Sequence, residues 1–121
     1  MNKLEYIRFL NGDIVYIHGS VRVISSCDGY YATYYDEDET LQEVNVNVIE
    51  GIPLTTAILE KNGWEHKDDV YFKEYPHRKL VVIDEKAYII NESCSLFLCK
   101  VEFVHQLQHL LFGLGVNEEW L

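Results

Sequence analysis

Two cysteines and two histidines near the C-terminus are the residues whose types best suit metal chemistry. They are spaced as Cys94-x4-Cys99-x5-His105-x3-His109, and thiolates and imidazoles are ligands that zinc prefers. A zinc finger, however, needs about twelve residues between its second cysteine and its first histidine. Here there are five. If residues 93–100 form a strand, the odd separation of Cys94 and Cys99 also puts them on opposite faces. We therefore expect no metal site and no cofactor.

The segment from His105 to His109 also resembles the H-E-x-x-H pattern of zinc hydrolases. Both histidines lie on one face if the segment is helical. In this chain Gln106 stands where the general-base glutamate would be, and an amide cannot accept a proton from water. The pattern therefore predicts a structural role, in which the imidazoles and amides bond to neighbouring segments.

An acidic run and a tyrosine-rich run are the next candidates. The run at 36–39 (DEDE) lacks the spacing of an EF-hand, because Leu41 stands where glycine is needed and Asn47 where glutamate is needed. An exposed turn is expected instead. In a strand, Tyr30 and Tyr34 face one way while Tyr31 and Tyr35 face the other, so one pair should be partly exposed. Such a pair suits peptide recognition, and cross-strand packing is the structural alternative.

Alternating apolar and polar residues, separated by turn dipeptides, dominate residues 1–52. Asn11-Gly12 and Asp28-Gly29 are typical of tight turns. The pattern predicts a small, strongly curled β-barrel of the SH3-like type. Its five expected strands span residues 6–10, 13–18, 21–27, 30–35 and 41–48.

A short helix and a second group of strands are expected after residue 52. Pro53 ends the preceding ladder, since its nitrogen carries no hydrogen. Thr55 is a typical helix N-cap, and Asn62-Gly63 is a typical helix end. An antiparallel meander is then expected, with strands at residues 70–75, 80–84, 87–90 and 95–99.

The C-terminal segment changes its period from two to that of a helix. Leucines and Val104 recur at helical spacing up to Leu114, which predicts an amphipathic helix on the second sheet. The expected fold class is α+β. The expected organisation is a β-barrel-like half over residues 1–52 and a half with the short helix, meander and terminal helix over residues 53–121, together in one compact unit.

Two segments resemble a family of short uncharacterised bacterial proteins, often encoded in prophage-like or mobile regions. The first follows IPLT-x3-L-x2-NG-[FW], from Ile52 to Trp64, and the second follows [YF]-V-H-x-L-Q-x-L-x-[FW], from Phe103 to Phe112. The resemblance covers roughly residues 40–115 and implies a shared fold, without an activity or a binding residue. Many relatives continue IPLT with two glutamates. Here Thr56-Ala57 stands there, which removes favourable charge from the first helical turn.

Composition excludes some classes of function. Ten Lys and Arg residues against twenty Asp and Glu residues give a net charge of −10 over 121 residues. Binding to a nucleic-acid backbone needs a basic surface, so nucleic acid is not an expected partner. The apolar runs are far shorter than the ~20 residues of a membrane span, so no membrane association is expected. Three cysteines without a leader sequence predict free thiols and a cytoplasmic setting.

A non-enzymatic protein–protein interaction module of prophage or mobile-element type is the function that these observations favour. Its expected contact residues are Tyr31, Tyr35, Asp36, Glu37, Asp38 and Glu39. Two alternatives stay open: an acidic inhibitor that mimics nucleic acid, and a small enzyme that uses His77, Asp84 or His105. The partner is an unknown protein. The chain is expected to be a monomer or, through the apolar residues 110–112, a homodimer.

Overall fold

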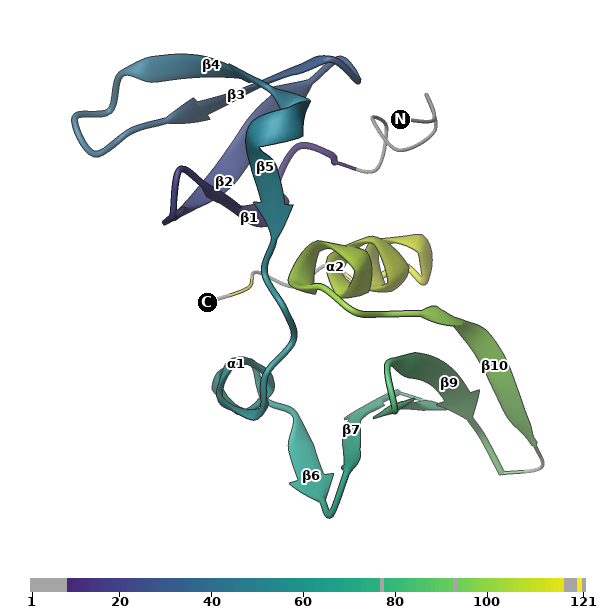
Figure 1. The fold of residues 1–121 in the computed structure, drawn as a ribbon. Coiled ribbons are helices and arrows are strands. Elements are labelled where there is room, and N and C mark those ends of the chain that lie inside the picture. The colour runs from purple at the N-terminus through teal and green to yellow at the C-terminus, as the bar shows by residue number, and fades with distance from the viewer. Residues whose placement is uncertain (1–8, 77, 93, 117–119, 121) are drawn as a thin grey trace.

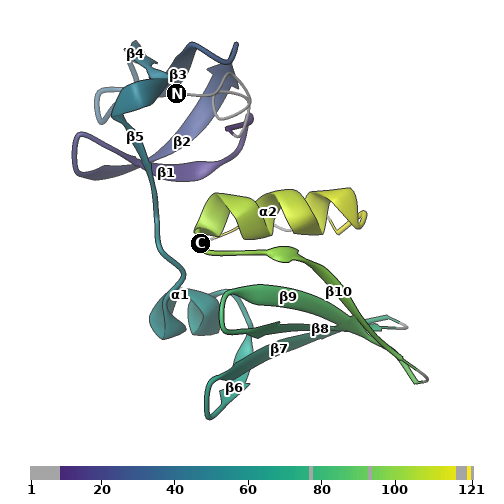
Figure 2. The ribbon, with the colours of Figure 1, turned by 45° about the vertical axis from the view of Figure 1, so that its right-hand side comes forward.

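The computed structural model describes residues 9–76, 78–92, 94–116 and 120. Over these residues the structure is α+β, as predicted, with two five-stranded antiparallel sheets and two α-helices. Figure 1 and Figure 2 show the first sheet and the second sheet on opposite sides of helix α2. The C-terminal helix is therefore shared between the two sheets.

The first sheet pairs consecutive strands and then brings its last strand back beside the first. Its order is β4-β3-β2-β1-β5. In the described part of the chain no ladder joins the edge strands β4 and β5, so the sheet is open. The predicted closed barrel is therefore wrong. The strands are β1 (Ile14–Ile17), β2 (Ser20–Cys27), β3 (Tyr31–Tyr35), β4 (Leu41–Asn45) and β5 (Ile49–Gly51).

The last expected strand of this half is also incorrect. Residues 41–48 were expected to be continuous, but the chain leaves the ladder after Asn45 and forms a 3₁₀ helix, η2 (Val46–Val48). The Asn45 side chain accepts a hydrogen bond from the Asn47 N–H at 2.9 Å, a local bond that competes with strand pairing. Residues 6–8 of the first expected strand lie outside the described residues, and Phe9 and Leu10 are not in a strand.

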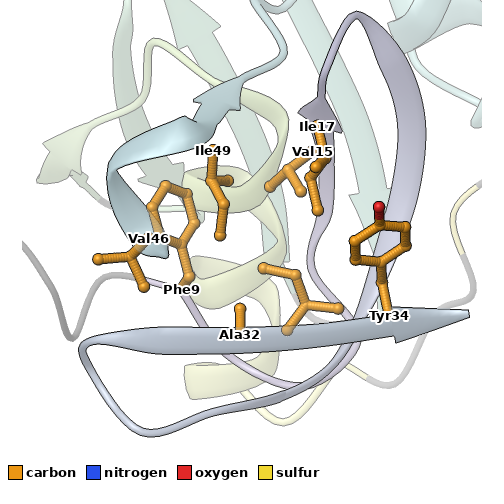
Figure 3. Packing of buried hydrophobic residues seen from close by; sticks show 8 residues of the cluster. Phe9, Val15, Ile17, Ala32, Tyr34, Val46 and Ile49 are labelled. Carbon is orange, nitrogen blue, oxygen red and sulfur yellow. The ribbon is translucent and has the colours of Figure 1, made fainter. Parts of the chain in front are cut away.

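Apolar side chains from the inner face of the first sheet form one of two hydrophobic clusters (Figure 3). The period of two in the sequence produces this cluster, since alternate residues of a strand face the same side. The cluster includes Val15 and Ile17 of β1, Ala32 and Tyr34 of β3, and Phe9 from the segment that precedes β1.

The second sheet is a meander in the order β10-β9-β8-β7-β6. All four predicted strands are present, and β6 is an additional short strand that the sequence pattern did not predict. The strands are β6 (Glu65–Lys67), β7 (Val70–Tyr75), β8 (Arg78–Ile83), β9 (Lys86–Ile90) and β10 (Ser95–Lys100).

Both helices begin and end close to the predicted positions. Helix α1 (Thr56–Lys61) begins after Thr55, whose hydroxyl accepts a hydrogen bond from the Ile58 N–H at 3.2 Å. Helix α2 (Val104–Gly113) places Leu107 and Leu111 in the second hydrophobic cluster, against β8 and β9. The guanidinium of Arg78 donates to the Leu114 carbonyl at 2.8 Å, which fixes the end of α2 to the second sheet.

Candidate functional site

Two of the four clustered tyrosines lie on the outer face of the first sheet. Tyr31 is 50% exposed and Tyr35 is 59% exposed, whereas Tyr34 belongs to the core. The alternation along β3 therefore exposes one pair, as predicted. Tyr30 precedes the strand and is also exposed, because it lies in the β2–β3 turn.

Tyr35 borders a shallow depression with residues from the neighbouring strand β2. The depression has a volume of about 440 Å³, and its lining includes Val21, Arg22 and Val23. Both valines are more than half exposed. A depression with exposed valines and a tyrosine on an antiparallel sheet can receive an extended segment with small apolar or proline side chains.

The acidic turn between β3 and β4 is ordered by its own first carboxylate. Asp36 accepts hydrogen bonds from the N–H groups of Asp38 and Thr40 and from the Gln42 side chain, at 2.8–3.0 Å. The Thr40 N–H, followed by the Gln42 amide, holds the pKa of Asp36 below its ordinary value, since these donors favour the charged form. Asp36 therefore shapes the turn.

The other three carboxylates of this turn remain at the surface. Glu37 lies 3.2 Å from Arg22 Nη2, and Asp38 and Glu39 are exposed. Arg22 is the one Lys or Arg in residues 9–52. It is the one charged residue that lines the depression, and it is paired with Glu37, whereas Asp38 and Glu39 remain exposed in the turn that follows Tyr35.

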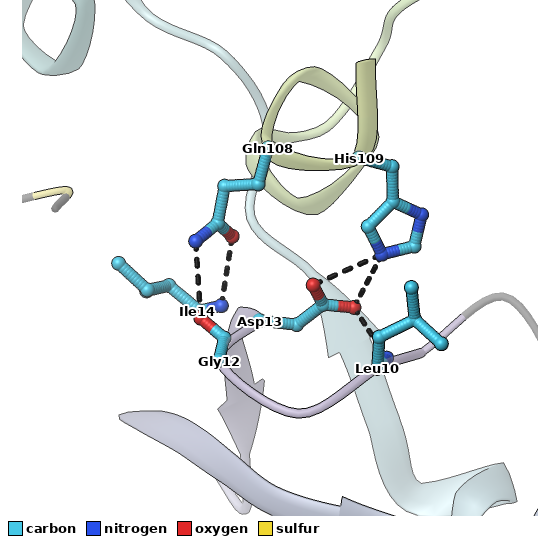
Figure 4. A network of polar contacts seen from close by, with 6 residues as sticks. All are labelled: Leu10, Gly12, Asp13, Ile14, Gln108 and His109. Carbon is cyan, nitrogen blue, oxygen red and sulfur yellow. Dashed lines mark hydrogen bonds and ion pairs between the residues drawn. The ribbon is translucent and has the colours of Figure 1, made fainter. Parts of the chain in front are cut away.

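A carboxylate–imidazole pair joins the first sheet to α2 (Figure 4). His109 Nε2 lies 2.7 Å and 2.9 Å from the two carboxylate oxygens of Asp13. Asp13 is only 3% exposed and also accepts a hydrogen bond from the Leu10 N–H at 2.7 Å. The carboxylate therefore has hydrogen-bond partners on two sides. A carboxylate that is buried needs such partners.

Gln108 makes a second link beside this pair. Its side-chain oxygen accepts from the Ile14 N–H, and its nitrogen donates to the Gly12 carbonyl, both at 3.0 Å. Figure 4 shows both bonds on the same face of α2 as His109. An amide is suited to this position because it donates and accepts at once.

His105 is fully buried in the structure. Its ring stacks on Phe103 with 5.8 Å between centroids, and it also contacts the rings of Phe9 and His109. The imidazoles and amides of this segment were expected to bond to neighbouring segments. His109 and Gln108 do so, and the His105 ring lies among aromatic rings.

The cysteines and the other catalytic candidates do not join these histidines. Cys94 is exposed beside the β9–β10 turn and contacts Asn91, whereas Cys99 packs against the second cluster. In the part of the chain that the structure describes, no three His, Cys, Asp or Glu side chains are grouped to hold a metal ion. Asp84 is in the β8–β9 turn, and His77 lies outside the described residues.

The Asp13–His109 pair borders a cavity of about 460 Å³ beside α2. The described residues that line it supply no hydroxyl or thiol side chain. The pair could orient a base, but the lining provides no nucleophile for it to activate.

Sequence reasoning missed Asp13, the partner of His109. Asp13 stands directly after the Asn11-Gly12 turn and begins an apolar strand, a position where an exposed carboxylate is ordinary. Its burial depends on a helix 96 residues away. The signal available was the unusual pair of polar residues Gln108-His109 next to the leucines of α2.

Neither helix of the described residues has both the length and the hydrophobicity to cross a membrane. The chain matches no protein-family model, no curated protein and no solved structure.

Proposed function

We propose that the protein is a non-enzymatic interaction module whose first sheet binds a basic segment of a protein partner. One observation carries the proposal: Tyr31, Tyr35, Val21 and Val23 are all at least half exposed on a single small sheet. Large apolar side chains gathered at a surface are typical of protein-binding sites. Tyrosine suits such a site because its ring is apolar and its hydroxyl remains hydrated.

Negative charge around these residues favours a basic partner. Residues 36–39 lie at one end of β3, and Glu43 lies across the ladder from Thr33. Arg22, the one Lys or Arg in residues 9–52, is paired with Glu37. Lysine or arginine side chains on a partner would meet carboxylates at the rim while apolar groups enter the depression beside Tyr35.

We further propose that the first sheet is related to SH3-like folds. Its last strand returns to pair with the first, and a 3₁₀ helix precedes that strand; this strand order resembles that of SH3-like sheets. SH3 domains bind proline-rich segments in aromatic-lined grooves. The likeness therefore supports an extended, proline- and lysine-containing segment as the ligand of the tyrosine face.

The acidic-mimic alternative has less support. A mimic of nucleic acid presents carboxylates in rows on one face. Here Lys67, Lys79 and Lys86 are on the second sheet among the acidic residues, so negative charge is not continuous over the molecule. The excess of negative charge is greater in residues 9–52, where one basic residue stands against eight acidic ones.

Selection of peptides from a random 12-residue library tests the proposal. The protein is used as the bait, and the double variant Tyr31→Ser/Tyr35→Ser is used for counter-selection. We expect enriched peptides that contain Lys or Arg with Pro or aromatic residues and that bind the double variant at least about tenfold more weakly.

The matched control is Phe97→Ser, which removes an equally exposed aromatic residue (53%) from the second sheet. It should leave the affinity of the selected peptides unchanged. Enrichment of acidic peptides, or equal loss of binding in the Phe97 variant, would contradict the assignment of the tyrosine face.

A further inference from the structure

The cavity beside α2 is a second concave feature, which shares Asn11 but not Tyr35 with the depression on the first sheet. Its volume of about 460 Å³ is within the range of small-molecule sites. Most of its lining is apolar and comes from Leu10, Leu111, Phe112, Val116 and Trp120. The polar side of the cavity is formed by residues 11–13, Gln108 and His109.

The hydrogen bonds of Asp13 determine which nitrogen of His109 carries a proton. The carboxylate can only accept, and both of its oxygens are within 2.9 Å of Nε2, so Nε2 carries a hydrogen. In this tautomer Nδ1 has a lone pair. A carboxylate partner also makes this nitrogen a stronger acceptor.

Nδ1 of His109 is available to a ligand. Figure 4 shows it on the side of the ring away from Asp13, and among the described residues no hydrogen bond reaches it. The His109 side chain is 28% exposed and borders the cavity. An accepting atom is thus placed at the edge of a largely apolar space.

We propose that this cavity binds a small, mainly apolar molecule with one hydroxyl group, which donates a hydrogen bond to Nδ1 of His109. Aromatic side chains at 112 and 120 favour a ligand with a ring. Asp13 acts as a positioning residue, since it fixes the tautomer of His109.

Titration of the full chain with p-cresol, followed by the side-chain nitrogen signals of its histidines, tests the proposal. Toluene is the matched probe, because it has the same ring and methyl group without the hydroxyl. We expect a saturable change in the Nδ1 signal of His109 with p-cresol and an affinity about tenfold lower for toluene.

Two variants separate this site from general apolar binding. Phe112→Ser removes an apolar side chain that is 75% exposed at the cavity and should weaken both probes. Leu96→Ser, a matched exposed position on β10, should weaken neither. His109→Gln should remove the preference for p-cresol; if that variant does not fold, the Phe112 variant still tests the site.

Equal affinity for the two probes, or no saturable change at His109 with millimolar p-cresol, would overturn the proposal. Either result would leave peptide binding at Tyr35 unaffected, because that residue is not among those that line this cavity.

Discussion

Nε2 of His109 lies 2.7 Å from Oδ2 of Asp13, although 96 residues separate the two in sequence. Asp13 precedes the first strand of the first sheet, and His109 is on the helix whose leucines pack on the second sheet. This pair, with the two bonds of Gln108, gives the arrangement of the two sheets a specific polar link.

Replacing His109 with alanine should lower the free energy of unfolding by about 2 kcal/mol. The reason is that Asp13 would remain buried with its charge and would lose the imidazole that contacts both oxygens. Urea denaturation followed by circular dichroism measures the difference.

His66→Ala is the matched control for this change. His66 also contacts a carboxylate, Glu60, at 2.9 Å, but both side chains of that pair are well exposed. A surface pair contributes at most about 1 kcal/mol, so the control should change stability little. Equal losses in the two variants would refute a structural role for the Asp13–His109 pair.

Gly51→Ala should destabilise the protein by about 1–3 kcal/mol through overpacking. A Cβ atom at residue 51 would lie 2.6 Å from Phe103 Cγ and 3.1 Å from His105 Cε1. The His105 ring is fully buried and stacks on Phe103, so the two rings cannot move away without cost. Thermal unfolding gives the comparison with the wild-type protein.

Gly113→Ala should change stability in the direction opposite to Gly51→Ala. A Cβ atom there meets no other atom within 4 Å, and the residue is the last of α2. Alanine at this position should stabilise the helix by up to about 1 kcal/mol. If both alanine variants changed the melting temperature in the same direction, the close contact at Gly51 would not be the cause.

Local signals explain why much of the fold is predictable from the sequence. Thr55 and Asn62-Gly63 mark the ends of α1, and the leucine period gives α2, because capping and periodicity depend only on neighbouring residues. The strand Val70–Tyr75 and its successors follow for the same reason.

Features that depend on distant contacts were not predictable. The 3₁₀ helix after Asn45 is the exception, because its signal is local: the Asn45 side chain bonds to the Asn47 N–H where a valine period indicated a strand. Whether β4 and β5 pair depends on the curvature of the whole sheet, so the closed barrel was wrong. Asp13 was missed because its partner is in the last helix, and a single sequence gives no sign of that contact.

The rate of alkylation should differ between Cys94 and Cys99. Burial raises the pKa of the Cys99 thiol, since burial disfavours the thiolate, whereas Cys94 is exposed. At pH 8 iodoacetamide should therefore modify Cys94 well before Cys99, as peptide mass spectrometry can measure. Modification of Cys99 at the same rate as Cys94 would contradict the position of Cys99 against the second cluster.

Asp28→Asn should destabilise the protein at neutral pH and less so in acid. Asp28 accepts hydrogen bonds from the N–H groups of Tyr31 and Tyr30, both at 2.8 Å, and these bonds lower its pKa. A carboxylate whose pKa is lower in the folded protein stabilises the fold at a pH above the pKa that it has in the unfolded chain. This contribution is lost as the pH falls through the pKa of the folded protein. The wild-type and variant stabilities should begin to converge as the pH falls below about 4, the ordinary pKa of an aspartate. A constant difference would contradict this.

The most direct test of the proposed function is site-specific photo-crosslinking in the native host. A photoreactive phenylalanine analogue replaces Tyr35 in one strain and Phe97, similarly exposed on the second sheet, in another. We predict that position 35 crosslinks to one discrete protein with a basic segment at the crosslinked peptide, and that position 97 does not. No crosslink at position 35 above that at position 97, or a crosslink to an acidic segment, would contradict the proposed binding face.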